Sequence, residues 1–199
     1  MLYEIAHVIK DKFSFFWEVV ERGNKILFIF QHKRNIKDIP SLLNQISTDS
    51  LIIRMTKETD APKLAAFFKE QPENAFKFFK PHGFDEKSML KVIRNKSFLT
   101  FVVTEGEVIV GYFFLRCFAN GKCFRGKIVH KKWQGKGIAK LMGKAMTLVS
   151  EKLNLRMFGS ISPDNYASMA SAKASNNLKV HKVLENGYFY IEFLPKSQE

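Results

Sequence analysis

Apolar residues recur every three or four positions through the first part of the chain, and a short apolar run interrupts this spacing. From residue 2 to residue 20 the spacing predicts an amphipathic helix, which Gly23-Asn24 ends. The run 25–32, rich in Ile and Phe, predicts a short buried strand. Asp38-Ile39-Pro40 favours a helix start, because proline is tolerated in a first helical turn. Residues 1–50 are therefore expected to form a helix–strand–helix extension.

From residue 51 the pattern alternates between strand-like and helix-like segments. The predicted strands are 51–56, 98–104, 108–117, 123–130, 157–162, 179–184 and 188–194. The predicted helices are 59–69, 85–95, 138–153 and 165–175, with an aromatic loop at 71–84. Strand 157–162 follows a strand and a helix, so it should lie parallel to the strand before that helix. The order predicts an α/β (α+β) domain over residues 51–199, with a mixed central sheet flanked by helices.

A glycine-rich turn joins the predicted strand 123–130 to the predicted helix 138–153. Gly135 and Gly137 leave room for a ligand to approach the backbone, and the first turn of the helix presents N–H groups without intrahelical partners. The helix dipole and three neighbouring lysines add positive charge: Lys131, Lys132 and Lys136. We expect a phosphate or pyrophosphate here, although a tight turn before an ordinary helix has the same composition.

Charge is distributed unevenly along the 199 residues. The chain has a formal net charge of +13, to which residues 51–199 contribute 25 basic and 13 acidic side chains, or +12. Such a domain favours an anionic ligand, and coenzyme A or a nucleotide-linked acceptor would fit. A lysine-rich surface without a partner gives the same count. Nucleic acid is not expected, because no nucleic-acid-binding motif accompanies the charge.

The remaining composition is typical of a globular cytoplasmic protein. The longest apolar run, 26–30, is too short to span a membrane, and charged residues near the N-terminus do not match a secretory signal. The only two cysteines, Cys117 and Cys123, are expected to be reduced and give no basis for a metal site.

Three short motifs resemble those of one enzyme family. Gln134, Gly137 and Ala139 fit the pattern Gln/Arg-x-x-Gly-x-Gly/Ala, the pyrophosphate loop of the GNAT superfamily of acyl-CoA N-acyltransferases. Asn165 and Ser168 resemble the family's Asn-x-x-Ala/Ser helix start, and residues 184–188 its closing segment. The order of elements also agrees, so the resemblance covers roughly three quarters of the chain.

The resemblance implies acetyl-CoA as donor and a primary amine of a small molecule as acceptor, joined in a ternary complex. Ile128 and Val129 would pair with pantetheine through their backbone, and the N–H near Val129 would polarise the thioester carbonyl. The other implied cofactor-binding residues surround the pyrophosphate loop and the next helix start: Gln134, Gly135, Lys136, Gly137, Ile138, Ala139, Asn165 and Ser168.

The acid–base groups depart from the family pattern. Many members place a Tyr seven residues after the motif Asn, where this chain has Ala172, and many carry a Glu before the loop, where residues 123–129 have no carboxylate. The remaining candidates are His82, His130 and Tyr166. Each also has an ordinary interpretation, as a helix cap, a polar residue beside the loop, or a packing residue.

The stretch 79–84 resembles a Pro-His loop of GNAT members that acetylate amino sugars in surface-polysaccharide pathways. It predicts a nucleotide-linked amino sugar as the acceptor, whereas the basic domain would repel a polyamine. The alternative is a catalytically silent GNAT domain that binds acyl-CoA or a partner protein. Residues 1–50 would then be an interaction module. Three other roles stay open for them: they could complete a homodimer, cover the acceptor site or form a separate small domain.

Overall fold

A seven-stranded mixed sheet runs through the computed structural model, which describes residues 14–196, with side chains of the first helix described from residue 19. Its strand order is β1-β2-β3-β4-β5-β7-β6. In chain order the strands are β1 (Ile52–Met55), β2 (Phe98–Glu105), β3 (Val108–Phe118), β4 (Lys122–Val129), β5 (Arg156–Ile161), β6 (Asn177–Val183) and β7 (Phe189–Leu194). The predicted mixed sheet flanked by helices is confirmed.

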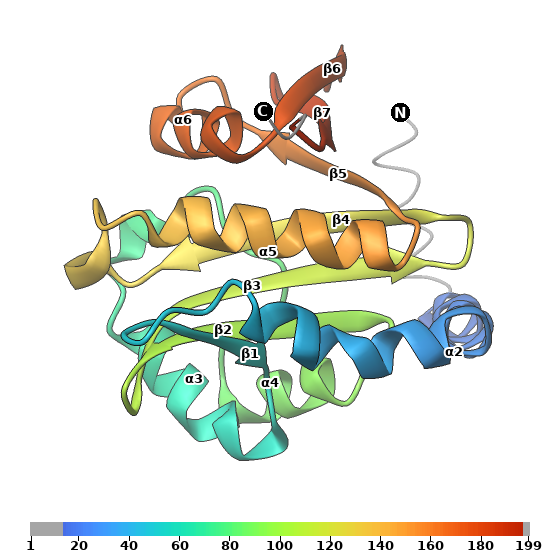
Figure 1. Ribbon diagram of the computed structural model, residues 1–199. Coiled ribbons are helices and arrows are strands. Elements are labelled where there is room, and N and C mark those ends of the chain that lie inside the picture. Colours follow the sequence, from blue (N-terminus) through green and yellow to red (C-terminus); the bar gives the residue numbers. More distant parts are fainter. Residues whose placement is uncertain (1–13, 197–199) are drawn as a thin grey trace.

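The single parallel pairing in this sheet joins β4 to β5, and it is short. Only three pairs form, from Lys122↔Arg156 to Phe124↔Phe158, before the two strands separate (Figure 1). The prediction that 157–162 lies parallel to the strand before the loop is thereby confirmed. All other neighbouring strands are antiparallel, so the sheet opens at one place, between β4 and β5.

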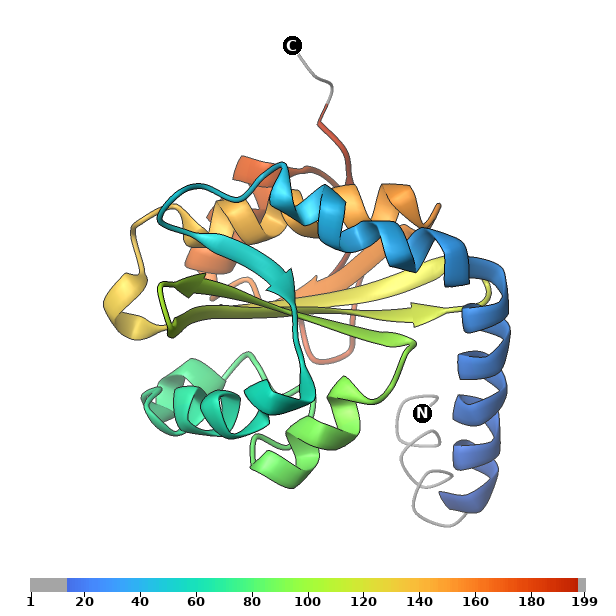
Figure 2. The ribbon, with the colours of Figure 1, turned by 60° about the horizontal axis from the view of Figure 1, so that its bottom comes forward.

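Helices cover both faces of the sheet. On one face lie α5 (Ile138–Lys152) and part of α2 (Ser14–Asn44), and on the other lie α3 (Ala61–Lys69) and α4 (Glu86–Ile93) (Figure 2). The last helix, α6 (Tyr166–Ser175), packs beside α5. Asp60 immediately precedes α3, and the Asp85 side chain caps α4 by accepting a hydrogen bond from the Ser88 N–H.

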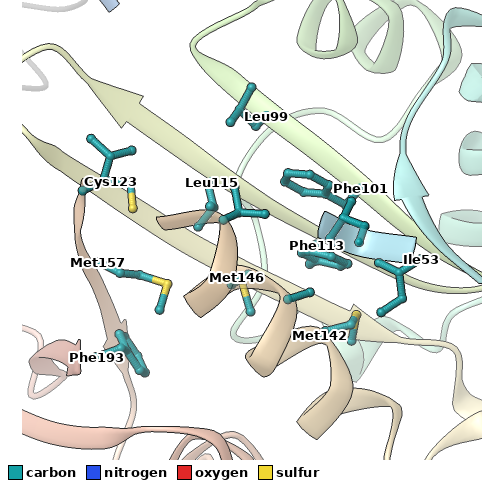
Figure 3. Close-up of a cluster of buried hydrophobic side chains, with 14 of the residues drawn as sticks. Ile53, Leu99, Phe101, Phe113, Leu115, Cys123, Met142, Met146, Met157 and Phe193 are labelled. Atoms are coloured by element: carbon teal, nitrogen blue, oxygen red, sulfur yellow. The ribbon is translucent and has the colours of Figure 1, made fainter. Parts of the chain in front are cut away.

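Apolar side chains of α5 interlock with the sheet to form the larger of two buried clusters (Figure 3). Met142 and Met146 pack against strands β2 and β3, where the Phe101 and Phe113 rings stack with centroids 4.8 Å apart. The smaller cluster lies on the opposite face, beneath α3 and α4. Both faces are therefore fixed by packing, and the opening between β4 and β5 is held in a rigid frame.

The prediction for the N-terminal extension is wrong in one element. Residues 25–32 are not a strand but part of α2, which continues through Gly23-Asn24. Asn24 does not end the helix; its side chain donates to the Cys117 carbonyl and accepts from the Ala119 N–H, which ties α2 to the β3–β4 hairpin. The prediction took the apolar run for a buried strand, but only Phe28 in it is fully buried, and Phe30 is 87% exposed.

The predicted helix start at Asp38-Ile39-Pro40 is also corrected, because Pro40 lies near the C-terminal end of α2. Ile39 and Leu43 are nevertheless fully buried, in the cluster shared with α5. The part of the predicted first helix at residues 2–13 lies outside the described residues. The domain boundary predicted at residue 50 stays a prediction.

Candidate active site

A cavity of about 900 Å³ passes through the sheet at the point where β4 and β5 separate. On the α5 side its walls include the start of α5 and the exposed edge of α6; on the α3 side they include the loop after α3 and aromatic residues of β3. The residues that line the cavity include Phe78, Phe79, Lys80, Phe98, Phe114, Arg116, Phe124, Arg125, Lys127, Ile128, Val129, Gln134, Gly135, Gly137, Ala139, Lys140, Gly159, Asn165, Ser168, Ser171, Ala172 and Tyr188.

Beyond Phe124 the β4 backbone has a free edge toward this cavity. The His130 N–H donates to the Val110 carbonyl at 2.9 Å, so His130 turns its backbone toward β3. Because hydrogen-bonding direction alternates along a strand, Ile128 also faces β3, whereas Lys127 and Val129 aim their N–H and C=O groups at the gap. An extended ligand can therefore pair with β4 there as another strand would.

The predicted anion loop occupies the end of the cavity beside α5. Gly135 and Gly137 have φ of +80° and +77°, a left-handed backbone that glycine adopts without strain, and Gly137 is the N-cap of α5. No atom lies within 4 Å of the space that a Cβ would fill at either glycine. Gly135, Gly137 and Ala139 all line the cavity, so the first turn of α5, where backbone N–H groups lack intrahelical partners, borders it as a phosphate site requires.

Asn165 and Ser168 line the same cavity from α6. The Asn165 side chain accepts from the Ser168 N–H at 3.1 Å, and it therefore caps the helix as well. Ala172, where the family pattern led us to look for a Tyr, also lines the cavity and offers no proton. The helix start predicted from the motif is thus placed beside the anion loop.

His130 is buried beside the cavity and is not one of its lining residues. Its Nδ1 accepts from the Lys132 N–H at 3.2 Å, so Nε2 carries the proton and donates to Glu70 at 3.1 Å. The side chain is only 4% exposed and its ring contacts Phe67 and Trp133. These contacts hold the loop against the end of α3, which is a structural role.

His82 lies behind the aromatic wall of the cavity. Its Nδ1 donates to the Gly83 carbonyl at 2.7 Å, and its Nε2 accepts from the Tyr112 hydroxyl at 2.9 Å, which is the arrangement of a neutral imidazole. Burial lowers the pKa of His82, and burial also raises the pKa of Tyr112. Rings of Phe98 and Phe114 stand next to His82 and face the cavity in its place.

Tyr166, the third candidate, is 78% exposed and does not line the cavity, although its neighbours on α6 do. None of the three predicted acid–base residues is therefore placed on the cavity wall.

The cavity wall is basic, a property that the sequence interpretation missed. Five cations line it, Lys80, Arg116, Arg125, Lys127 and Lys140, whereas its described lining contains no carboxylate. Arg125 lies over the Phe193 ring at 4.1 Å and donates to Asn176 at 3.0 Å, and burial lowers its pKa to about 9. Alternation along β4 could have revealed the pattern, because Arg125, Lys127 and Val129 share one face of the strand.

Aromatic rings surround the α3 side of the cavity. Phe78 and Tyr188 approach from opposite walls, with ring centroids 6.5 Å apart, and Phe79 lies 6.3 Å from Phe114. Phe76 does not line the cavity and packs beneath the loop against Phe84. This chamber offers flat apolar surfaces with Lys80 and Arg116 among them.

The described residues also bear on metal binding and on membrane insertion. In the part of the chain that the structure describes, no cluster of three or more His, Cys, Asp or Glu residues could hold a metal ion. Among the described helices, none is long and apolar enough to cross a membrane.

Comparison with solved structures relates this fold to acetyltransferases. The chain is similar to the GNAT domain of S. lividans PAT, with 15% identity over 72% of this chain and 89% of that chain, and a TM-score of 0.63. It is similar to AAC(6')-Ib in complex with paromomycin and acetyl-CoA (13% identity, 74% and 96% covered, TM-score 0.57). It is also similar to a spermidine N-acetyltransferase SpeG chimera from Vibrio cholerae and hSSAT (21%, 73% and 96%, TM-score 0.55).

No curated protein matched this sequence. The family described as Acetyltransferase (GNAT) domain matches residues 50–175, the segment that contains β1 to α6 and both the anion loop and the separated strands. With the open sheet, the glycine loop and this match in agreement, the chain belongs to the GNAT acetyltransferase family.

Proposed function

We propose that this protein is an N-acetyltransferase that moves the acetyl group of acetyl-CoA to a primary amine in a ternary complex. The observation that carries the proposal is the continuous cavity, which has an anion loop at one end, a free strand edge in the middle and an aromatic chamber on the far side of the sheet. This arrangement gives the donor and the acceptor separate entrances and brings them together where β4 and β5 separate.

The donor site follows from the backbone. N–H groups of Gly135 to Ala139 would hold the pyrophosphate of coenzyme A, with the α5 dipole adding to the attraction. Pantetheine would lie along the β4 edge. The N–H of Val129 or Lys127 would then donate to the thioester carbonyl and stabilise the negative charge that develops on its oxygen.

The charge and shape of the chamber support an anionic acceptor. Lys80 suits a phosphate group, and Phe78, Phe79 and Tyr188 offer faces on which a base or a sugar can stack. Arg116 also lines the cavity, but its guanidinium already pairs with Glu21 at 2.6 Å. A nucleotide-linked amino sugar combines these features with a primary amine. The paromomycin and spermidine named for two structural neighbours are polycations, which a wall without carboxylates would repel.

Catalysis in this site would depend mainly on positioning. An amine that arrives deprotonated next to a polarised thioester needs no covalent enzyme intermediate, and alignment alone supplies a large part of the rate. The absence of His82, His130 and Tyr166 from the cavity wall favours a second candidate, a silent domain that binds acyl-CoA without transferring it.

Calorimetry with acetyl-CoA tests the donor site. We expect binding by the wild type, weakening as salt increases, and a loss of at least tenfold in affinity for a Gly135→Glu, Gly137→Glu double variant. The matched control is a Gly106→Glu, Gly121→Glu double variant, which places the same two charges at open glycines with positive φ, in the β2–β3 and β3–β4 turns. Absence of binding by the wild type would overturn the proposal.

Thiol release from acetyl-CoA then separates the two candidates. With nucleotide-linked amino sugars as acceptors, an enzyme releases coenzyme A in proportion to the amine, and spermidine gives much less. Tight acetyl-CoA binding without thiol release for any amine would favour the silent domain.

A further inference from the structure

Lys127 of β4 reaches across the donor half of the cavity. Its Nζ donates to the Ala139 carbonyl at 2.6 Å and to the Ser171 hydroxyl at 2.5 Å, so one ammonium group joins the start of α5 to the middle of α6. Both partners line the cavity, as Lys127 itself does. Any molecule that runs from the anion loop to the opening between the strands has to pass this group.

Lys127 has no counter-ion among the described residues. No described carboxylate lies within 4 Å of Nζ, and the groups that α5 and α6 present to it, the Ala139 carbonyl, Gly143 and the Ser171 hydroxyl, are uncharged. Arg125, two residues earlier on the same face of β4, is a further cation. A half-buried cation in such surroundings lacks the negative partner that usually accompanies it.

The surroundings also make Lys127 a ready proton donor. Burial is the main cause that lowers its pKa to about 7, and the field of Arg125 acts in the same direction. An ammonium group with this pKa is partly protonated near neutrality and gives its proton to a stronger base at little cost.

The free β4 edge gives a bound donor a path that runs past Lys127. A coenzyme A molecule held by its pyrophosphate at Gly137 would run along the β4 edge past Val129. It would meet Lys127 before it reaches Phe124, the last residue of β4 that pairs with β5. The four residue steps from Val129 back to Arg125 span about 13 Å of strand. Ser171 is also adjacent to Ala172, the position on the wall that has no proton to offer.

We propose that Lys127 binds the sulfur of coenzyme A and donates a proton to it when the thioester is cleaved. The inference rests on the proposed function, since it needs coenzyme A in this cavity. Lys127 thereby takes the acid role that none of His82, His130 and Tyr166 is placed to perform.

The step balances as follows. The lone pair of the acceptor amine forms the new C–N bond, the C–S bond breaks, and its electron pair goes to sulfur. The Nζ–H proton of Lys127 then passes to the thiolate, which gives the free thiol. The proton lost by the acceptor nitrogen goes to water, and neutral Lys127 takes up a proton from solvent before the next turnover.

The test needs no acceptor, because coenzyme A itself reports on the sulfur site. Ultraviolet thiolate absorbance of bound coenzyme A is followed against pH for the wild type, Lys127→Met and Lys127→Arg. The control is Lys140→Met, which removes another cation that lines the cavity. We expect the wild type to lower the thiol pKa by at least about one unit, a tenfold stabilisation of the thiolate, relative to Lys127→Met. Lys127→Arg should retain part of the shift, and Lys140→Met all of it.

The outcomes separate this inference from the proposed function. If the wild type binds coenzyme A and the thiol titrates at the same pH in Lys127→Met, Lys127 does not act on the sulfur and the inference is overturned alone. If the wild type does not bind coenzyme A, the proposed function fails and the inference with it. If Lys127→Met does not fold, as judged by its melting curve, Lys127→Arg decides. An arginine cannot give up its proton, so it should hold the thiolate at low pH and leave product release slow.

Discussion

Phe124 of β4 and Phe158 of β5 form the last backbone pair before the two strands separate, and their rings lie 6.3 Å apart. On one side of this pair the sheet is continuous, and on the other the cavity passes through it. The position of this last pair thus limits how far an acyl donor can extend along β4. Gly159, the residue after Phe158, borders the opening without a side chain to narrow it.

Gly159→Val should weaken acetyl-CoA binding. A Cβ at this position would lie 3.1 Å from the Phe193 ring and 3.6 Å from the Arg125 carbonyl, so the added methyl groups have to occupy the gap or push the strands apart. We expect an affinity loss of about tenfold and a stability loss of about 1–3 kcal/mol, measured by calorimetry and by urea unfolding.

The control is Gly111→Val, which introduces a comparable clash, with Met142 at 3.1 Å, on the α5 face of β3. It should lose similar stability without a matching loss of affinity. Equal affinity losses in both variants would show that the effect comes from general loosening of the sheet.

Phe28 and Phe30 test the corrected N-terminal helix. The two side chains would share a face in a strand, but in α2 they point in different directions, and they are 0% and 87% exposed. Phe28→Ala should cost about 3–5 kcal/mol by leaving a cavity between α2 and the sheet, whereas Phe30→Ala should change stability by less than about 0.5 kcal/mol. Urea unfolding at neutral pH measures both, and similar costs for the two would argue against the helix.

The same pair of residues shows where sequence prediction succeeded and failed. Between residues 51 and 194 every predicted strand and helix is present, because turn residues separate them and the apolar residues of α3, α4 and α5 recur at helical spacing. The run 25–32 has no such period. Ile26, Leu27 and Phe30 are exposed apolar residues on a helix, and a buried strand of the same composition cannot be told from it by pattern alone.

The candidate site divides in a similar way. The anion loop was predictable because glycine spacing and a helix start are local features. The positions of His82 and His130 were not, because their partners, Tyr112 and Glu70, lie 30 and 60 residues away in sequence. The role of Lys127 was not predictable either, because its partners Ala139 and Ser171 lie on two helices, 12 and 44 residues away in sequence.

His82 should make stability depend on pH. Its pKa in the folded protein is below the ordinary 6.5 because burial disfavours the charged form. The unfolded chain therefore binds more protons over the window between the two values, and stability is lost as pH falls through 6.5. Urea unfolding at about pH 7.5 and about pH 5.5 should show a smaller loss for His82→Gln than for the wild type. His32, whose pKa burial also lowers, contributes in the same direction and remains in the variant. An identical loss in both proteins would exclude His82 as a source.

Glu192 of β7 should stabilise the C-terminal strands in the same pH sense as His82, but over a more acidic range. Its carboxylate accepts from Arg156 at 2.7 and 2.9 Å and from His181 at 2.8 Å, and the Arg156 hydrogen bonds are the main cause that lowers its pKa to about 2. The stabilisation is therefore complete above the ordinary value of 4.5 and is lost as pH falls toward 2.

Glu192→Gln should cost about 1–2 kcal/mol at neutral pH, a range reduced because the Arg156 side chain is 57% exposed and solvent screens its charge. Urea unfolding at about pH 7 and about pH 3 measures the cost. It should shrink at the lower pH, because the Glu192 carboxylate takes up a proton in the unfolded chain there while the folded protein holds it ionised. Glu151→Gln, at an exposed position of α5, is the comparison for loss of one negative charge. A cost for Glu192→Gln that does not change with pH would mean that shape and packing, and not the ionised carboxylate, hold β5, β6 and β7 together.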